Sequence, residues 1–113
     1  MLKTVTFLRK KPGMSTEAFR EYYEQHHRLI GEKYLAGLAS RYVRRYLNPQ
    51  GQQELADYDV ILEIWFADEA AYQACGERLG EPSVALEIAE DEKHLFERSS
   101  MRSYTVNECE STL

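Results

Sequence analysis

The stretch "DYDVILEIWF", from Asp57 to Phe66, decides both the fold and the assembly that the sequence predicts. Its β-branched and aromatic residues are typical of a β-strand, in which successive side chains point to opposite faces of a sheet. One face would receive Val60, Leu62, Ile64 and Phe66, and the other would receive Ile61, Glu63, Trp65 and Ala67. Both faces of this strand are therefore largely apolar, and each of them needs a cover.

The flanking segments alternate between strand and helix signals. Strand-like composition marks Leu2–Lys10, Ser40–Leu47 and Ser100–Glu108, and the polar, Pro- and Gly-containing stretch 48–56 predicts a hairpin before Asp57–Phe66. Helical spacing marks about Thr16 to about Leu35, with Ser15 as N-cap, and then Asp68–Leu79, a break at Gly80–Pro82 and a second helical piece. The order β-α-β-β-α-β predicts an α+β, ferredoxin-like fold with a four-stranded antiparallel sheet and its helices on one face.

The length of the chain limits what can cover the second sheet face. With 113 residues, it is long enough for one core, and we expect one domain over residues 1–113. No segment remains to form another layer. We therefore predict a homodimer in which the sheets of two protomers pack face to face.

Composition excludes several classes of partner. The net charge of −5 gives nucleic acid and anionic membranes no overall attraction, and no apolar run is long enough to span a bilayer. The first residues lack the pattern of a signal peptide, so we expect a cytoplasmic protein. Cys75 and Cys109 are far apart and have no metal-binding or redox spacing, which predicts two reduced thiols.

The candidate chemistry begins with two adjacent histidines in the stretch "FREYYEQHHRLIGEKYL". Histidine exchanges protons near neutral pH, but successive helix residues point about 100° apart, so only one can occupy the centre of the buried stripe. Spacing from Phe19 and Tyr23 predicts that His26 is buried and His27 lies on its flank. Spacing alone favours a packing role over a catalytic role for each of them, and the positions around His27 predict no metal site.

Glu63 interrupts an apolar strand, where a carboxylate is costly unless it is paired. One interpretation is a structural ion pair with an arginine of the preceding strand, for instance Arg45. The other is that Glu63 orients a helix histidine or accepts its proton. Both remain open from the residues alone.

Several segments resemble the EthD-domain family of the dimeric α/β-barrel superfamily. They are "MLKTVTFLRKKPGMSTEAFREYYEQHH", "YVRRYLNP", "YDVILEIWFADEAAY" and "IAEDEKHLFERSS". The family pattern of Phe, Tyr-aromatic and His is met by Phe19, Tyr22, Tyr23 and His27, so the resemblance selects His27 where periodicity favours His26. The chain departs from the family after this histidine, because Arg28, Leu29 and Ile30 stand where relatives often have x-Pro-Leu.

The resemblance implies a dimer of ferredoxin-like protomers with a cavity between sheet and helices. It also implies an enzyme that needs no metal or organic cofactor and cyclises, dehydrates, isomerises or oxidises a small aromatic or polyketide-like compound. His27 would be the acid/base and Glu63 its orienting carboxylate, while Tyr23, Tyr34, Trp65 and Phe96 would line the site. The alternatives are a non-catalytic carrier with the same cavity and a structural dimeric module.

Overall fold

The computed structural model describes residues 1–51 and 57–113. Its centre is one antiparallel sheet with the strand order β2-β3-β1-β4. The strands are β1 (Leu2–Leu8), β2 (Arg41–Tyr46), β3 (Val60–Phe66) and β4 (Arg102–Thr105). The predicted ferredoxin-like fold is confirmed. Residues 52–56 of the predicted hairpin lie outside the described residues, but β2 and β3 pair antiparallel as expected.

The helices begin and end near their predicted limits. The first helical region consists of α1 (Thr16–Tyr22), the π-helical turn η1 (Tyr23–His27) and α2 (Arg28–Leu35). The second consists of α3 (Glu69–Leu79) and α4 (Pro82–Glu92), followed by the short 3-10 turn η2 (Arg98–Ser100). Ser15 caps α1 by accepting a hydrogen bond from the Ala18 amide at 3.1 Å. None of the helices in the described part of the chain could cross a membrane.

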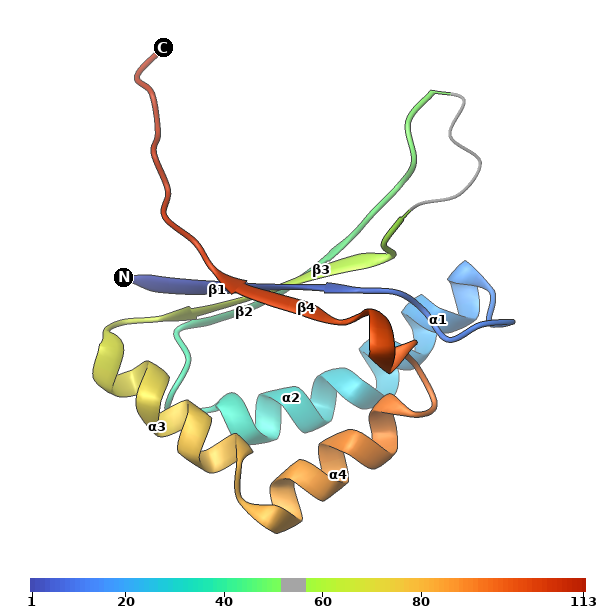
Figure 1. The fold of residues 1–113 in the computed structure, drawn as a ribbon, viewed down its shortest axis with the longest axis horizontal. Coiled ribbons are helices and arrows are strands. Elements are labelled where there is room, and N and C mark those ends of the chain that lie inside the picture. The colour runs from blue at the N-terminus through green and yellow to red at the C-terminus, as the bar shows by residue number, and fades with distance from the viewer. Residues whose placement is uncertain (52–56) are drawn as a thin grey trace.

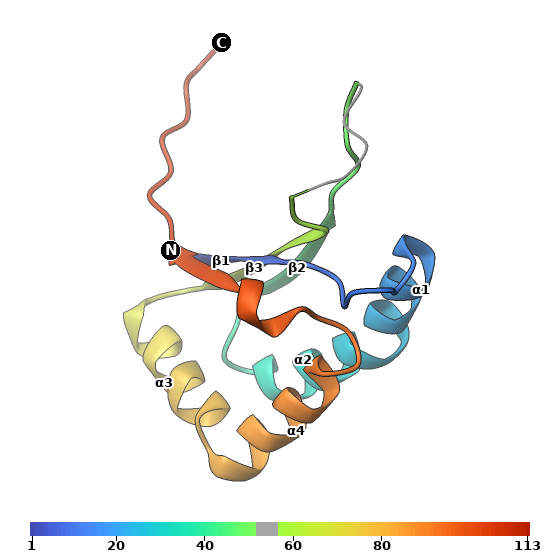
Figure 2. The same ribbon diagram turned by 45° about the vertical axis from the view of Figure 1, so that its right-hand side comes forward.

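All of the helices in residues 1–51 and 57–113 lie on one side of the sheet. Figure 1 shows α2, α3 and α4 below the strands, while the chain after β4 leaves on the opposite side. The turned view in Figure 2 shows the same separation. We call the helix-free side of the sheet the open face.

Two hydrophobic clusters fill the space between sheet and helices. The first contains Leu8, Phe19, Tyr23, Val60, Leu95 and Phe96, and the second contains Leu35, Phe66 and Cys75. Tyr42 of β2 packs against both clusters. The helix-facing side of the sheet is therefore covered within one protomer, as the alternation of β3 requires.

The register of the sheet defines the open face. Residues that pair directly across antiparallel strands share a face, so Ile61, Glu63 and Trp65 lie there with their partners. These partners are Lys3, Val5, Phe7, Arg41, Val43, Arg45, Arg102 and Tyr104. Apolar and aromatic side chains share this face with cationic ones. None of the described helices lies on this side of the sheet.

Candidate functional site

The turn η1 decides which histidine is buried. The Arg28 amide donates to the Tyr23 carbonyl, five residues back, so this turn is wider than an α-helical one. His27 is consequently buried, with 8% of its surface exposed, whereas His26 is exposed and its ring lies 4.8 Å from that of Tyr22. The prediction that His26 packs in the core is wrong, because a uniform helical period does not hold through a π-helical turn.

A carboxylate orients His27. Its Nδ1 lies 2.7 Å from Oδ2 of Asp91 in α4, and the other oxygen of Asp91 accepts a hydrogen bond from the Tyr22 hydroxyl at 2.5 Å. Burial, together with this hydrogen bond, raises the pKa of Tyr22 to about 12. An Nδ1–H group that donates to Asp91 leaves the lone pair of a neutral imidazole on Nε2. In the described residues, Nε2 has no hydrogen-bond partner.

His27 lines a cavity of about 110 Å³ between the helices and the sheet. The wall is mostly apolar and contains members of both hydrophobic clusters. The complete lining is Tyr23, His27, Ile30, Gly31, Tyr34, Leu35, Tyr42, Leu62, Ile64, Leu79, Ile88 and Glu92. An apolar cavity of about 150 Å³ can hold one benzene molecule, so this smaller space would admit no more than a single small ring.

Tyr42 and Gly31 shape one side of this cavity together. The Tyr42 hydroxyl donates a long hydrogen bond of 3.4 Å to the hydroxyl of Tyr23, whose burial raises its pKa well above the usual range. A Cβ on Gly31 would lie 2.6 Å from the Tyr42 hydroxyl oxygen and 2.8 Å from its ring carbons. The absence of a side chain at position 31 therefore lets the ring lie against α2.

Gly31→Ala should destabilise the protein even though alanine favours helices. The gain in helix propensity is about 1 kcal/mol, whereas overpacking costs about 1–3 kcal/mol. Gly76→Ala in α3 is the matched control, because its added Cβ meets nothing within 4 Å and should stabilise the fold. Urea unfolding measures the free energy of unfolding, which should be lower than wild type for Gly31→Ala and higher for Gly76→Ala. A Gly31→Ala protein more stable than wild type would contradict the packing described for Tyr42.

Glu92 contributes a carboxyl group to the cavity lining. It is one residue beyond Asp91 at the end of α4, and 12% of its side chain is exposed. Burial raises the pKa of its carboxyl, although the nearby charges of His27 and Arg98 oppose this effect. Its nearest ionic contact is Nε of Arg98 at 3.5 Å. The cavity thus combines an imidazole and a carboxyl group within apolar walls.

Glu63 does not belong to this site. It lies on the open face, where Nε and Nη2 of Arg45 each lie 2.9 Å from Oε2 and Lys3 contributes a second ion pair at 3.5 Å. Burial acts to raise the pKa of Glu63, but Arg45 and Lys3 outweigh it and lower the value. The expectation that Glu63 orients His27 is wrong for this protomer, because the sheet separates them and Asp91 takes that position.

The predicted pocket residues divide between three places. Tyr23 and Tyr34 line the His27 cavity, and the Tyr34 hydroxyl donates to Glu87 of α4. Phe96 is buried in the first cluster, with its ring 5.5 Å from that of His27, and it does not line the cavity. Trp65 lies on the open face between Lys3 and Arg41, so its predicted place in the cavity is wrong for the same reason as that of Glu63.

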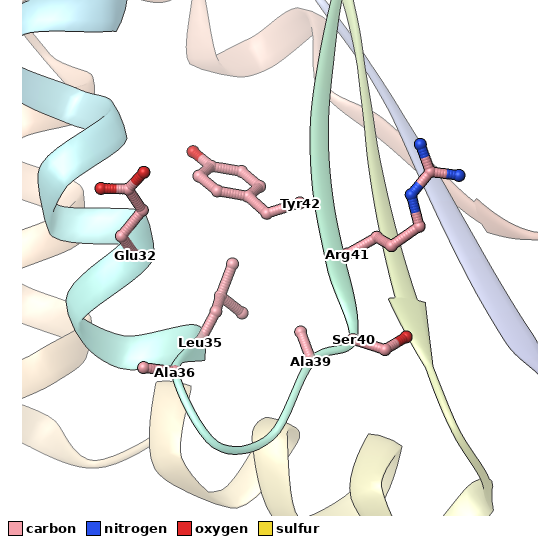
Figure 3. A pocket seen from close by; sticks show the side chains of 7 residues that line it. All are labelled: Glu32, Leu35, Ala36, Ala39, Ser40, Arg41 and Tyr42. Atoms are coloured by element: carbon pink, nitrogen blue, oxygen red, sulfur yellow. The ribbon is translucent and has the colours of Figure 1, made fainter.

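Another hollow, of about 240 Å³, lies beside the start of β2. Figure 3 shows Tyr42 reaching from β2 toward α2, with Glu32 on the helix side, while Arg41 points away across the strand. Its remaining lining residues are Leu35, Ala36, Ala39 and Ser40. This hollow places no imidazole beside a carboxyl group, so the His27 cavity is the better candidate for proton transfer. Across the described ranges, no cluster of three potential metal ligands was found.

Comparison with known proteins gives the family. The EthD domain model matches residues 11–99, which is most of the chain. This match includes the whole first helical region, α4 and the cavity between them. No curated protein matches the sequence.

Solved structures share the fold at low sequence identity. An ethyl tert-butyl ether d (ethd) family protein from Bacillus halodurans has a TM-score of 0.68 at 14% identity, covering 96% of this chain and 100% of that one. A dabb family protein with a ferredoxin-like fold from Mesorhizobium loti has a TM-score of 0.57 at 14% identity, with coverages of 96% and 97%. An antibiotic biosynthesis monooxygenase has a TM-score of 0.56 at 14% identity, with coverages of 97% and 100%.

Proposed function

We propose that this chain, which belongs to the EthD-domain family, is a cofactor-independent enzyme that acts on a small aromatic or polyketide-like compound by proton transfer through His27. The observation that carries this proposal is the His27–Asp91 pair at the wall of a largely apolar cavity. Apolar walls with a few convergent polar groups are typical of sites for small organic ligands. Candidate reactions are cyclisation, dehydration, isomerisation and oxidation.

The role of each residue follows from its contacts. Asp91 fixes the ring of His27 through Nδ1, so Nε2 is the atom that would take a proton from the ligand and return it. Tyr23, Tyr34 and Tyr42 would contact the ligand ring. Because burial raises the pKa of Tyr23 and of Tyr42, both phenols stay protonated near neutral pH.

A non-catalytic carrier is the second candidate, because the apolar cavity alone is sufficient for binding. Proton exchange with a test ligand distinguishes the enzyme from the non-catalytic carrier. Cyclohexanone is a single ring with one carbonyl, and an enzyme of the proposed kind should speed the replacement of its α-hydrogens by deuterium in D₂O. ¹H NMR follows this loss of signal. Exchange at the buffer rate, together with saturable binding, would favour the carrier.

We also propose that the open face forms the interface of a homodimer. Phe7 lies 5.3 Å from Tyr58 and 6.0 Å from Tyr104 in ring-centroid distance, and Tyr104 is 54% exposed. These rings adjoin the apolar residues of β1, β2 and β3 on a face that none of the described helices covers. A second copy of the same face would complement it through a two-fold axis.

Ile61→Glu should convert the dimer into a monomer. The substitution places a carboxylate in the middle of the open face, opposite Phe7 and Arg45, where a packed interface would bury it. Leu86→Glu is the control, because Leu86 is 61% exposed on α4, on the helix side. Sedimentation equilibrium at micromolar concentration measures the mass. A wild-type monomer, or an Ile61→Glu dimer as tight as wild type, would contradict this interface.

A further inference from the structure

Glu92 has no assigned role in the proposed reaction. Residues 91 and 92 are adjacent, yet Asp91 is held by His27 and Tyr22, whereas the described residues give the Glu92 side chain no hydrogen bond. Its single ionic contact, with Arg98, is long at 3.5 Å, and Arg98 is itself 47% exposed. A mostly buried carboxyl with unused hydrogen-bonding capacity is costly unless a ligand or water satisfies it.

Because Glu92 lines the cavity, a ligand there could use its free hydrogen-bonding capacity. Glu92 lines the same cavity as His27, and the two residues come from elements that the Asp91 contact holds together. The cavity wall around them is formed by Ile30, Leu62, Ile64, Leu79 and Ile88, which offer no polar partner. A small ring in this space would meet both an imidazole and a carboxyl group.

We propose that Glu92 is a second proton-transfer residue of the cavity, which gives or takes a proton at an oxygen of the ligand while His27 acts on a neighbouring atom. This inference rests on the proposed function and deepens it, because it defines the ligand as a neutral ring compound with a carbonyl or hydroxyl oxygen. Burial keeps a larger share of Glu92 protonated than an exposed glutamate would be at the same pH.

The proton movements balance without an oxidant. Nε2 of His27 takes a proton from the carbon beside the ligand carbonyl, and the electron pair of that C–H bond forms a C=C bond. The carbonyl oxygen simultaneously receives the carboxyl proton of Glu92, so the product is the enol isomer of the ligand. Return of the two protons regenerates both side chains. In D₂O, the reverse step delivers deuterium to the carbon.

Several charged or titratable groups surround Glu92. On the described elements packed against the cavity these include Tyr22, Tyr23, Glu24, His27, Glu32, Tyr34, Tyr42, Arg44, Glu87, Asp91 and Arg98. Of these, the positive charges of His27 and Arg98 lower the pKa of Glu92, and Asp91 raises it. Replacing His27 by a neutral residue should therefore raise the pKa of Glu92 further.

A ligand-free titration tests this coupling. In protein labelled with ¹³C at the glutamate carboxyls, the Glu92 signal is identified by its loss in Glu92→Gln, and its titration should lie above that of the exposed Glu90. His27→Gln should move it to higher pH, whereas His26→Gln, beside it in sequence but exposed, should not. Titration of Glu92 together with Glu90, or equal effects of both histidine variants, would overturn the proposal.

Deuterium exchange of cyclohexanone is the second test. Glu92→Gln should lower the protein-catalysed rate about 100-fold or more, the lower end of the usual contribution of a positioned acid or base. Glu90→Gln, whose carboxyl pairs with Lys93 on the surface, should retain the wild-type rate. A rate that depends on His27 but not on Glu92 overturns this inference alone. A wild-type protein without exchange would instead refute the proposed function, while the titration still decides whether Glu92 and His27 are coupled.

Discussion

Replacing His27 by alanine should lower kcat/KM of the proposed reaction by about 10²- to 10⁴-fold, the usual contribution of a positioned acid or base. The reason is that, among the described residues, His27 is the only imidazole that lines the cavity, and Asp91 fixes its ring through Nδ1. Deuterium exchange of cyclohexanone supplies the rate. His27→Gln should lower the rate as well, without the loss of packing, because the glutamine amide can still donate a hydrogen bond to Asp91.

His26→Ala is the matched control for this prediction. His26 is adjacent in sequence, but it is exposed and contacts only the ring of Tyr22 among the described aromatic side chains. The variant should keep the wild-type rate, and its stability should change by no more than about 0.5 kcal/mol, as for most surface substitutions. Equal loss of activity in both variants would show that the helix, rather than the His27 imidazole, matters.

Glu24→Gln should cause the second large effect, a loss of about 2 kcal/mol in the free energy of unfolding. Its carboxylate binds Arg44 of β2 through two hydrogen bonds of 3.0 and 2.8 Å, and it accepts a third from the Tyr46 hydroxyl at 2.5 Å. These contacts tie η1, which carries His27, to the sheet. The substitution leaves the mostly buried Arg44 guanidinium without its counter-charge.

The effect of Glu24→Gln should depend on pH. The hydrogen bond from Arg44 is the largest cause of a pKa for Glu24 below its usual value of 4.5. A carboxyl with a lowered pKa in the folded state stabilises the protein above its unfolded-state pKa, and this contribution disappears as pH falls through the folded-state value. The difference between wild type and Glu24→Gln should therefore be constant near neutral pH and shrink below about pH 4.5.

Glu32→Gln is the control for the Glu24 variant. Like Glu24, Glu32 forms an ion pair with an arginine, in this case Arg28 at 2.9 Å, but the Glu32 side chain is exposed on α2. Such surface pairs contribute about 0.3–0.5 kcal/mol. Urea unfolding at several pH values compares the variants. A Glu24→Gln loss as small as that of Glu32→Gln would contradict the role given to the contact between η1 and β2.

The fold could be predicted because each of its elements has a local signal. The alternation of Val60–Phe66, the cap at Ser15 and the break before Pro82 depend on near neighbours in the sequence, and the structure has each of them. The same alternation also placed Glu63 and Trp65 on the face away from the helices. Assigning them to a cavity between helices and sheet contradicted that pattern, and the structure corrects both assignments.

The identity of the buried histidine could not be predicted from periodicity. A single π-helical turn from Tyr23 to His27 changes the phase of the helix, and no residue in it marks the change. The family pattern that begins at Phe19 selected His27, the histidine that is buried, because the pattern spans the turn without assuming a period.

Asp91 and Glu92 were missed, although a signal for them exists. Val84 and Ile88 form an apolar stripe on α4, and continuing it by three or four residues reaches Asp91 and Glu92. Carboxylates at positions where a stripe predicts apolar residues indicate polar partners inside the protein. Naming His27 as that partner, however, requires the long-range packing of α4 against the first helical region.

The most direct test of the central claim is a ligand titration that observes each imidazole separately. The chain has three histidines, so an aromatic ¹H–¹³C spectrum contains three ring Cε1–H signals, assigned by single replacement of His26, His27 and His94. Resorcinol, a neutral single ring with hydroxyl groups, serves as the ligand. If the cavity is the functional site, the His27 signal shifts along a saturable curve while the His26 and His94 signals stay in place. Saturable shifts confined to His26 or His94, or no shift at His27 at millimolar resorcinol, would contradict it.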